Sequence, residues 1–372
     1  MRIAILGSGG REHAIVHSIS KSKKIKKIYC LPGNAGTSNF AKNVSIDINK
    51  FQQVYEFIKQ ERINLVIVGP EQPLVDGIVD FLEERNIKIF GPNKIASQLE
   101  GSKTFTKNLC KKYNIPTAAF GIYENKKDSL NFINNAKHPL VIKADNLAAG
   151  KGVYICKNKE ESSLAINEIF NGKFGRAEKI LFEEFLIGEE MSYFIISDGK
   201  NFKNFGTAQD HKRVLEGDKG KNTGGMGAYS PSRLINKVLE NKILKKIIYP
   251  TLIGLEELGC KYRGFLYAGL MIVKNEPYLI EYNVRMGDPE CQVILPRLNT
   301  DLVKIISFAV KNRLNAINIK WKKIKCMTIV LCSKGYPGKY KKLIKINNLK
   351  KIKIKKNSFI YHAGTKNINE DI

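Results

Sequence analysis

Glu281 and Asn283 are two oxygen-bearing side chains that stand two residues apart, directly after the apolar pair Leu279-Ile280. Alternate residues of a strand point to the same side, so both side chains would share one face. A carboxylate and an amide oxygen form a hard-oxygen site that suits Mg²⁺ shared with phosphates. If the strand continues, Arg285 joins this face and can stabilise charge on a transferring phosphoryl group. A solvated edge strand is the ordinary alternative, but the apolar pair favours partial burial.

A lysine lies inside the apolar run Pro139-Leu140-Val141-Ile142-Lys143. A buried ammonium is costly unless it has a partner, and a phosphate could be that partner. The small-residue loop that follows, with Gly150, Lys151 and Gly152, could fold over phosphates. It is not a Walker loop, because Gly152 stands where Ser or Thr is required. A glycine–lysine loop alone is most often a hairpin, so only its combination with Lys143 favours phosphate binding.

Acidic residues follow the next apolar strand. The run Ile180-Leu181-Phe182 ends in Glu183 and Glu184, and a short apolar stretch then leads to Glu189 and Glu190. Peptide groups at a strand edge can bind adenine, and a carboxylate can hold ribose hydroxyls. The alternative is a strand that leaves the core into a solvated acidic turn, which this pattern alone favours.

Near the N-terminus a strand passes through Gly7-Ser8-Gly9-Gly10 into a helix. Backbone N–H groups at such a helix start can bind phosphate. A dinucleotide fingerprint is disfavoured, because Glu12 occupies its small sixth position and Leu31-Pro32-Gly33-Asn34 stands where the ribose-binding acid is expected. A phosphate site for another nucleotide-like substrate fits better, and a tight turn without a ligand is the alternative.

The elements that must position these residues fall into three segments, 1–101, 102–298 and 299–372. The first alternates apolar strands with helices, which predicts an α/β unit with a doubly wound parallel sheet. Its expected strands are 2–6, 27–31, 64–68 and 87–90, and its expected helices are 11–21 and 74–84. The second segment is richer in strands, which predicts an α+β domain with antiparallel sheets. Its expected helices are 102–113, capped by Ser102, and 232–258. The third segment is predicted to hold a helix to Arg313 and strands at 326–331 and 351–355.

The net charge of +27 is concentrated in the third segment, where residues 302–369 contain 18 Lys and Arg but no Asp or Glu. Lys, Ile and Asn have AT-rich codons, so compositional drift explains this better than nucleic-acid binding, which usually adds arginine forks and stacking aromatics. A basic surface that attracts anionic substrates is the second alternative. Seven cysteines without a C-x-x-C pair favour reduced thiols in a cytoplasmic protein. No signal peptide and no apolar run of about 18 residues is present, so we expect no membrane partner.

In their order and spacing these stretches resemble the phosphoribosylamine–glycine ligases of the ATP-grasp class, from Met1 to about Lys366. The matching stretches are Gly9-Gly10-Arg11-Glu12-His13-Ala14, Pro32-Gly33-Asn34-Ala35-Gly36, Gly69-Pro70-Glu71, Leu99-Glu100-Gly101-Ser102-Lys103, Gln209-Asp210-His211-Lys212-Arg213, Asn222-Thr223-Gly224-Gly225-Met226-Gly227-Ala228-Tyr229-Ser230-Pro231, Gly287-Asp288-Pro289-Glu290 and His362-Ala363-Gly364-Thr365-Lys366. The resemblance implies a central ATP-grasp domain. It also implies that ATP, glycine and 5-phosphoribosylamine give glycinamide ribonucleotide, ADP and phosphate through glycyl phosphate, in de novo purine biosynthesis.

The resemblance also implies roles for individual residues. ATP would be bound by Lys103, Lys143, Gly150, Lys151, Gly152, Glu183, Leu186 and Glu190, of which the first two hold phosphates, Glu183 and Leu186 the adenine, and Glu190 the ribose. Mg²⁺ or Mn²⁺ would be held by Glu281 and Asn283. Arg285, Asp210 and Lys212 would act in catalysis, the last two on the acyl-phosphate side. The phosphoribosylamine side would be formed by Gly9, Gly10, Pro32, Gly33, Asn34, Gly36 and Glu71.

Two departures from the family pattern bear on these expectations. Asn146 stands where the family usually has glycine, which is expected to stiffen the loop over ATP. The family continues beyond His362–Lys366, whereas this sequence ends at Ile372, either because the third domain is reduced or because the gene is split or frameshifted. We therefore expect a monomer that can self-associate through a partial C-terminal domain.

Two other functions are weighed against this one. A different ATP-grasp ligase, related to purine or biotin carboxylases, is disfavoured by the Gly9–His13 and Asn222–Gly227 stretches. An inactive, basic nucleic-acid-binding or scaffold protein is disfavoured, because four site residues are intact: Lys143, Glu281, Asn283 and Arg285.

Overall fold

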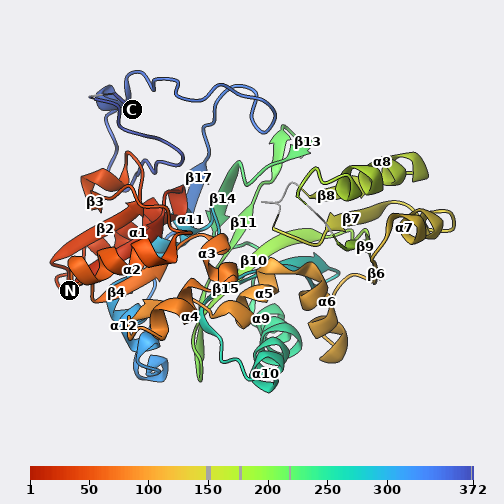
Figure 1. The fold of residues 1–372 in the computed structure, drawn as a ribbon, viewed down its shortest axis with the longest axis horizontal. Coiled ribbons are helices and arrows are strands. Elements are labelled where there is room, and N and C mark those ends of the chain that lie inside the picture. Colours follow the sequence, from red (N-terminus) through yellow and green to blue (C-terminus); the bar gives the residue numbers. More distant parts are fainter. Residues whose placement is uncertain (148–151, 176–177, 218, 370) are drawn as a thin grey trace.

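The computed structural model describes residues 1–372 except 148–151, 176–177, 218 and 370 (Figure 1). Its N-terminal part is a five-stranded parallel sheet in the order β3-β2-β1-β4-β5. The strands are β1 (Arg2–Gly7), β2 (Lys27–Pro32), β3 (Lys42–Asn43), β4 (Leu65–Val68) and β5 (Ile89–Phe90). The helices between them are α1 (Gly10–Ser20), α2 (Phe51–Gln60), α3 (Glu71–Asp76), α4 (Ile78–Glu83) and α5 (Lys94–Gly101). The central strands are apolar throughout because both faces of the sheet are covered. The predicted parallel sheet is confirmed.

The helix predicted at 74–84 is wrong in one respect, because the structure divides it. Gly77 ends α3 and precedes α4 with a φ of +98°. That left-handed conformation is one that glycine adopts without a steric penalty. The apolar spacing on either side of Gly77 reads as one helix, but the chain changes direction there.

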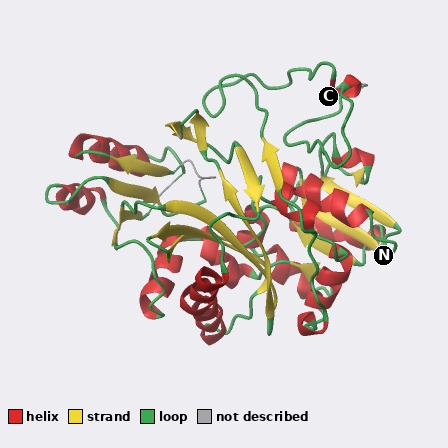
Figure 2. Ribbon diagram, turned by 180° about the vertical axis from the view of Figure 1, so that it is seen from behind, coloured by secondary structure: helices red, strands yellow, loops and turns green. Residues whose placement is uncertain are grey.

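The middle of the chain forms two antiparallel sheets (Figure 2). A six-stranded sheet has the order β16-β15-β10-β11-β14-β17, and a four-stranded sheet has the order β6-β9-β7-β8. The strands are β6 (Phe120–Tyr123), β7 (Leu140–Ala144), β8 (Val153–Cys156), β9 (Ile180–Glu184), β10 (Glu189–Asp198), β11 (Phe202–Asp210), β14 (Gly227–Ser230), β15 (Arg263–Val273), β16 (Glu276–Asn283) and β17 (Cys326–Ile329), with a separate hairpin of β12 (Arg213–Leu215) and β13 (Lys219–Asn222). In Figure 1 the four-stranded sheet and its two helices, α7 (Lys126–Ile133) and α8 (Lys159–Phe170), form one end of the molecule.

Helices α6 (Lys103–Lys112) and α9 (Lys237–Ile243) pack against β16 of the six-stranded sheet, and α10 (Tyr249–Glu257) packs against α6. Ser102 caps α6, as predicted, with its side chain accepting from the backbone of Phe105. The helix predicted at 232–258 begins later than expected, after Asn236, whose side chain caps α9. A π-helical segment, Leu244–Ile248, then connects α9 to α10.

After β16 the chain forms α11 (Cys291–Ile294), α12 (Leu302–Val310) and the edge strand β17. The strand predicted at 351–355 is wrong: the structure has a 3-10 turn, Leu349–Lys351, followed by irregular chain. Ile352 and Ile354 are 53% and 56% exposed there. Alternation of lysine and isoleucine makes a strand only where a neighbouring strand supplies hydrogen bonds, and no described strand pairs with this segment.

The hydrophobic core lies on both faces of the parallel sheet and is shared with the six-stranded sheet. On one face Ala4 and Leu6 belong to the same cluster as Tyr193 of β10. On the other face Ile3 and Ile5 join a cluster that includes Phe194 and the buried side of α12. A third cluster fills the space between the four-stranded sheet and its two helices. None of the described helices is long and apolar enough to cross a bilayer.

Candidate active site

A cluster of three buried ionised side chains lies between α6 and the four-stranded sheet. The Lys143 ammonium lies 2.9 Å from one Glu183 carboxylate oxygen, and the Lys107 ammonium lies 3.1 Å from the other. Val141 pairs with Glu183 across β7 and β9, so Lys143, two residues on, is on the same face. Burial opposes the charge of Glu183, but the two lysines outweigh it and hold its pKa below the usual range. The predicted buried lysine therefore has a partner within the protein.

Lys103 begins the same helix and points towards the loop after β7. Its ammonium donates to the carbonyl oxygen of Asn146 at 2.9 Å. Burial, partly offset by Glu281, lowers the pKa of Lys103. The Asn146 side chain donates to the Phe174 carbonyl at 2.9 Å, which ties this loop to the chain before β9. Gly150 and Lys151 lie outside the described residues, whereas the Gly152 carbonyl accepts from the backbone of Ala144.

The residues predicted for adenine and ribose lie where β9 leads into β10. Leu186 is half-buried, and Glu190 is exposed on β10. The Glu190 carboxylate forms an ion pair with the Lys212 ammonium at 3.1 Å. The carboxylate assigned to ribose is thus paired with a residue assigned to catalysis.

Lys212 lies among acidic groups that come from three strands. Its ammonium is 3.8 Å from Glu281, in addition to its contact with Glu190. Burial favours the neutral amine, but Asp210 and Glu190 outweigh it and raise the pKa of Lys212. Burial and the nearby carboxylates raise the pKa of Asp210. These four side chains line a small recess together with Tyr267.

Glu281 and Asn283 lie on one face of β16, on either side of the buried Tyr282, so the prediction that they share a face is confirmed. Glu281 stands opposite Gly269 of β15, where a Cβ would lie 3.2 Å from the Glu281 side chain. Among the described residues no group of three or more His, Cys, Asp or Glu could hold a metal by itself. The pair fits Mg²⁺, which usually takes one or two protein oxygens and completes its shell with phosphates and water.

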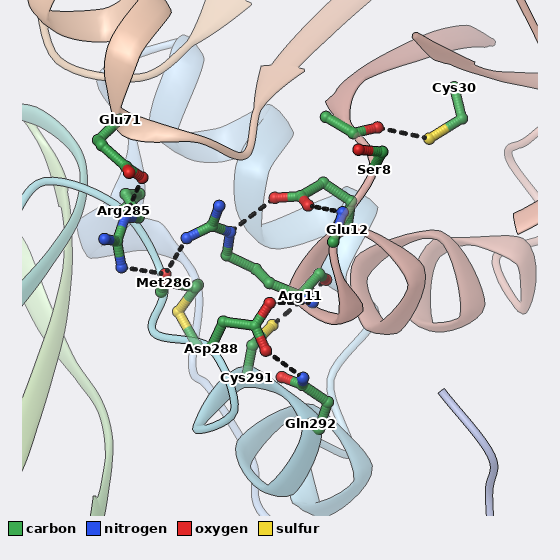
Figure 3. A network of polar contacts seen from close by, with 12 residues as sticks. Ser8, Arg11, Glu12, Cys30, Glu71, Arg285, Met286, Asp288, Cys291 and Gln292 are labelled. Carbon is green, nitrogen blue, oxygen red and sulfur yellow. Dashed lines mark hydrogen bonds and ion pairs between the residues drawn. The ribbon is translucent and has the colours of Figure 1, made fainter. Parts of the chain in front are cut away.

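Arg285 does not continue the face of Glu281 and Asn283, because β16 ends at Asn283. Its guanidinium instead binds Glu71 at 3.1 Å (Figure 3). It also binds Glu100 at 2.6 Å. Burial raises the pKa of Glu100 to about 7 although Arg285 opposes this. Arg285 was expected beside Glu281 and Asn283 only if the strand continued, and it does not. The role of Arg285 on the phosphoryl group stays a prediction.

The start of α1 is occupied by two carboxylates (Figure 3). The N–H of Gly9 donates to Glu12 at 2.6 Å, and the N–H of Arg11 donates to Asp288 at 3.2 Å. A Cβ on Gly10 would lie 2.6 Å from the amide nitrogen of Gln292. A side chain at position 10 would therefore require the Gln292 amide to move. A substrate phosphate at this helix start would have to compete with Asp288.

The Pro32–Gly36 loop lies against the same glycine turn. The Asn34 side chain donates to the carbonyls of Ser8, Gly9 and His362 and accepts from the backbone of Gly36. Gly33 has a φ of +75°. The structure thus brings these predicted substrate residues together, and it uses the amide of Asn34 to hold the loop and the His362 segment.

Sequence reasoning assigned no role to three further groups. Glu290 accepts a hydrogen bond from Ser192 at 3.1 Å, and burial next to Asp210 raises the pKa of Glu290 to about 7. The hydroxyl oxygen of Tyr267 lies 3.0 Å from that of Ser192. Lys107 could have been found, because it stands four residues after Lys103 and so lies one turn along the same helix. The partners of Glu290 come from strands about 80 to 100 residues away and leave no local pattern.

Comparisons with known proteins agree with this architecture. The phosphoribosylglycinamide synthetase N domain matches residues 1–100, and the phosphoribosylglycinamide synthetase ATP-grasp (A) domain matches residues 101–291. The phosphoribosylamine–glycine ligase of Mesorhizobium japonicum is 46% identical over 98% of this chain and 86% of its own length. The one from Brucella melitensis is 44% identical with the same coverage.

Among solved structures, the phosphoribosylamine–glycine ligase from Thermotoga maritima has a TM-score of 0.85 and 34% identity, covering 100% of this chain and 89% of its own. The biotin carboxylase domain of the Hydrogenobacter thermophilus 2-oxoglutarate carboxylase, solved with MgADP and bicarbonate, has a TM-score of 0.64. It is 19% identical and covers 83% of this chain and 69% of its own, so it shares the fold alone.

Proposed function

The chain belongs to the phosphoribosylglycinamide synthetase family, and we propose how its residues divide the reaction of that family between two adjoining sites. It is an ATP-dependent ligase of purine biosynthesis that joins glycine to phosphoribosylamine. One observation carries the division. The segment Gly287–Glu290 joins the sites, because Asp288 contacts the start of α1 while Glu290 contacts Ser192 beside the acidic recess.

The ATP side is formed by α6, the four-stranded sheet and β10. Lys103 and Lys143 bind the phosphates. The surplus positive charge around Glu183 supports this role for Lys143, since Lys107 and Lys143 face one carboxylate. The end of β9 at Glu183 and the following chain at Leu186 bind adenine, and Glu190 binds the ribose. The loop with Gly150, Lys151 and Gly152 belongs to the same ATP site, as predicted from the sequence.

Activation of glycine takes place at the recess around Lys212. Glu281 and Asn283 hold Mg²⁺ or Mn²⁺, which supplies neutralisation of phosphate charge when bound. The carboxylate of glycine attacks the γ-phosphate, giving glycyl phosphate and ADP. Lys212 and Asp210 balance charge beside the acyl phosphate, in keeping with phosphoryl transfer that depends on positioning and electrostatics. Arg285 would reach the phosphoryl group only by releasing Glu71 or Glu100.

The phosphoribosylamine side lies at the start of α1 and the Pro32–Gly36 loop, with Glu71 at its border. Gly9 and Gly10 allow the backbone to approach the substrate, whose phosphate replaces Asp288 at the helix N-terminus. The substrate amine then attacks the glycyl carbonyl and displaces phosphate. The product is glycinamide ribonucleotide, with one ADP and one phosphate released for each turnover.

The test is a coupled assay of ADP and phosphate release with ATP, Mg²⁺, glycine and freshly made phosphoribosylamine. We expect release to require all of these components, and mass spectrometry to identify glycinamide ribonucleotide. A carboxylase would instead consume ATP when bicarbonate replaces glycine. ATP hydrolysis that is independent of glycine, or that follows bicarbonate, would contradict the proposal. Light scattering at assay concentration tests the expected monomer.

A further inference from the structure

Lys107 is a buried lysine that the reaction described above does not use. It lies on α6 and is only 2% exposed. Its ammonium contacts the Glu183 carboxylate at 3.1 Å, donates to the hydroxyl of Thr117, and lies 5.3 Å from the centre of the Phe120 ring. A lysine is almost never buried to this extent without a partner for its charge. Lys107 is therefore a buried residue that contacts Glu183 at the proposed adenine site.

The two lysines at Glu183 are held differently. Thr117, which binds the Lys107 ammonium, itself donates to the carbonyl of Leu279 at 2.6 Å, so this contact is anchored on β16. Among the described residues, Glu183 is the one hydrogen-bond partner of the Lys143 ammonium. Lys107 is consequently fixed by two groups, whereas Lys143 can turn towards a phosphate by breaking a single contact.

Such a turn would leave Glu183 with one cation instead of two. A buried carboxylate with no cation is strongly disfavoured and takes up a proton instead. We propose that Lys107 is a positioning residue for nucleotide specificity, the permanent counter-ion that keeps Glu183 ionised while Lys143 is bound to ATP phosphates. This inference rests on the proposed role of Glu183 at adenine.

The charge of Glu183 would decide which purine base is accepted. An ionised carboxylate can only accept hydrogen bonds, and the 6-amino group of adenine donates one. The 6-oxo group of hypoxanthine is an acceptor, so it would be repelled by the ionised form and bound by the protonated form. Loss of Lys107 should therefore weaken ATP and favour ITP.

The other titratable groups around Glu183 lie on the same elements. Lys103 and Cys110 are on α6 with Lys107, and Lys143 is on β7. Burial raises the pKa of Cys110 to about 12, so this thiol stays neutral over the range of the assay. Burial lowers the pKa of both Lys103 and Lys107, and Glu183 opposes this shift at Lys107. The charge of Lys103 also faces Glu281. Lys107 is thus the cation that can remain on Glu183 when ATP engages the other two lysines.

The experiment compares kcat/KM for ATP and for ITP in the full ligase reaction, from about pH 6 to about pH 9. Lys107→Met should lower kcat/KM for ATP by about tenfold or more, mainly through KM. The loss should be strongest at low pH, where Glu183 without this cation takes up a proton more readily. Its preference for ATP over ITP should fall by about tenfold at low pH and recover as the pH rises. Lys107→Arg keeps the charge and should stay close to the parent. The exposed Lys111→Met is the matched control on the same helix and should leave both values unchanged.

Equal losses for ATP and ITP at every pH in Lys107→Met would overturn the proposal and leave Lys107 a structural residue. If that variant does not fold, Thr117→Val removes the hydrogen bond that fixes Lys107 and should shift the preference in the same direction. An unchanged preference in Thr117→Val would then contradict the proposal. A parent protein that uses ATP and ITP equally would instead refute the role of Glu183 at adenine, and the inference with it. A parent that prefers ATP while both variants keep its preference refutes Lys107 alone.

Discussion

Glu100→Gln should reduce the loss of stability that the protein suffers as the pH rises. The Glu100 carboxylate accepts from Arg285 at 2.6 Å and from the backbone of Val284 at 2.8 Å. Burial nevertheless raises its pKa from 4.5 to about 7. Between these two values the folded protein binds a proton that the unfolded chain does not. The free energy of unfolding must therefore fall as the pH rises through this window.

The magnitude follows from the two pKa values of Glu100. Near pH 6 the bound proton favours the folded state by about 1.4 kcal/mol, and near pH 8.5 this contribution is close to zero. Glutamine resembles the protonated carboxyl and keeps an oxygen for the N–H of Val284, but it cannot titrate. The parent should therefore lose about 1.4 kcal/mol more than the variant between these two pH values.

Urea unfolding at both pH values, followed by circular dichroism, measures the difference. Glu84→Gln is the control, because that side chain is 74% exposed and its removal should leave the pH dependence of the parent unchanged. If the parent and Glu100→Gln lose the same stability, Glu100 does not titrate in this window. The attraction of Arg285 would then exceed the cost of burial, and the reasoning would be refuted.

Further predictions concern ATP, the metal, packing and charge. Lys143→Ala should abolish ATP turnover. It should lower the free energy of unfolding, measured with urea, by less than the about 3–5 kcal/mol typical of an unpaired buried charge, because Glu183 keeps its contact with Lys107. Glu281→Gln should still bind nucleotide but lose most turnover and regain part of it at high Mg²⁺ or with Mn²⁺, whereas Asn283→Asp should be milder; a Mg²⁺ titration of ADP formation that matches the parent would contradict the metal assignment. Gly36→Ala should destabilise by about 1–3 kcal/mol in thermal unfolding, because its Cβ would lie 2.1 Å from a histidine ring. Binding to nucleic acid should be weak, indifferent to sequence and lost near physiological ionic strength, and tight binding there would overturn the compositional explanation of the basic segment.

Elements whose residues carry their own signals were predicted from the sequence. The first strand is apolar and ends in glycines, and α1 and α6 begin at residues with clear N-terminal preferences. The prediction that Glu281 and Asn283 share one face of a strand is also confirmed, since the alternation of side chains along a strand depends on local geometry alone. Gly77 shows the limit, because the apolar spacing on either side of it is that of one helix and does not reveal its left-handed backbone.

Partners that are distant in sequence could not be predicted. The need of Lys143 for a counter-charge follows from its apolar strand, but the identity of that group, Glu183, depends on how β7 and β9 pair. Arg285 binds Glu71 and Glu100, which are 214 and 185 residues away. No spacing rule connects such residues, and only the complete fold shows that the guanidinium faces these carboxylates instead of the metal pair.

The shared core has a consequence for synthesis on the ribosome. The parallel sheet is complete at Phe90, yet one of its faces packs with Phe194 of β10 and with α12, which ends at Val310. At a translation rate of about 5–20 residues per second, roughly 10–40 s pass between synthesis of the last strand of the sheet and synthesis of α12. During that interval the N-terminal segment depends on chaperones or on transient collapse to avoid aggregation. A ribosome-stalled chain that ends before α12 should therefore remain sensitive to protease at β1 and β4, although every residue of that sheet has already been made.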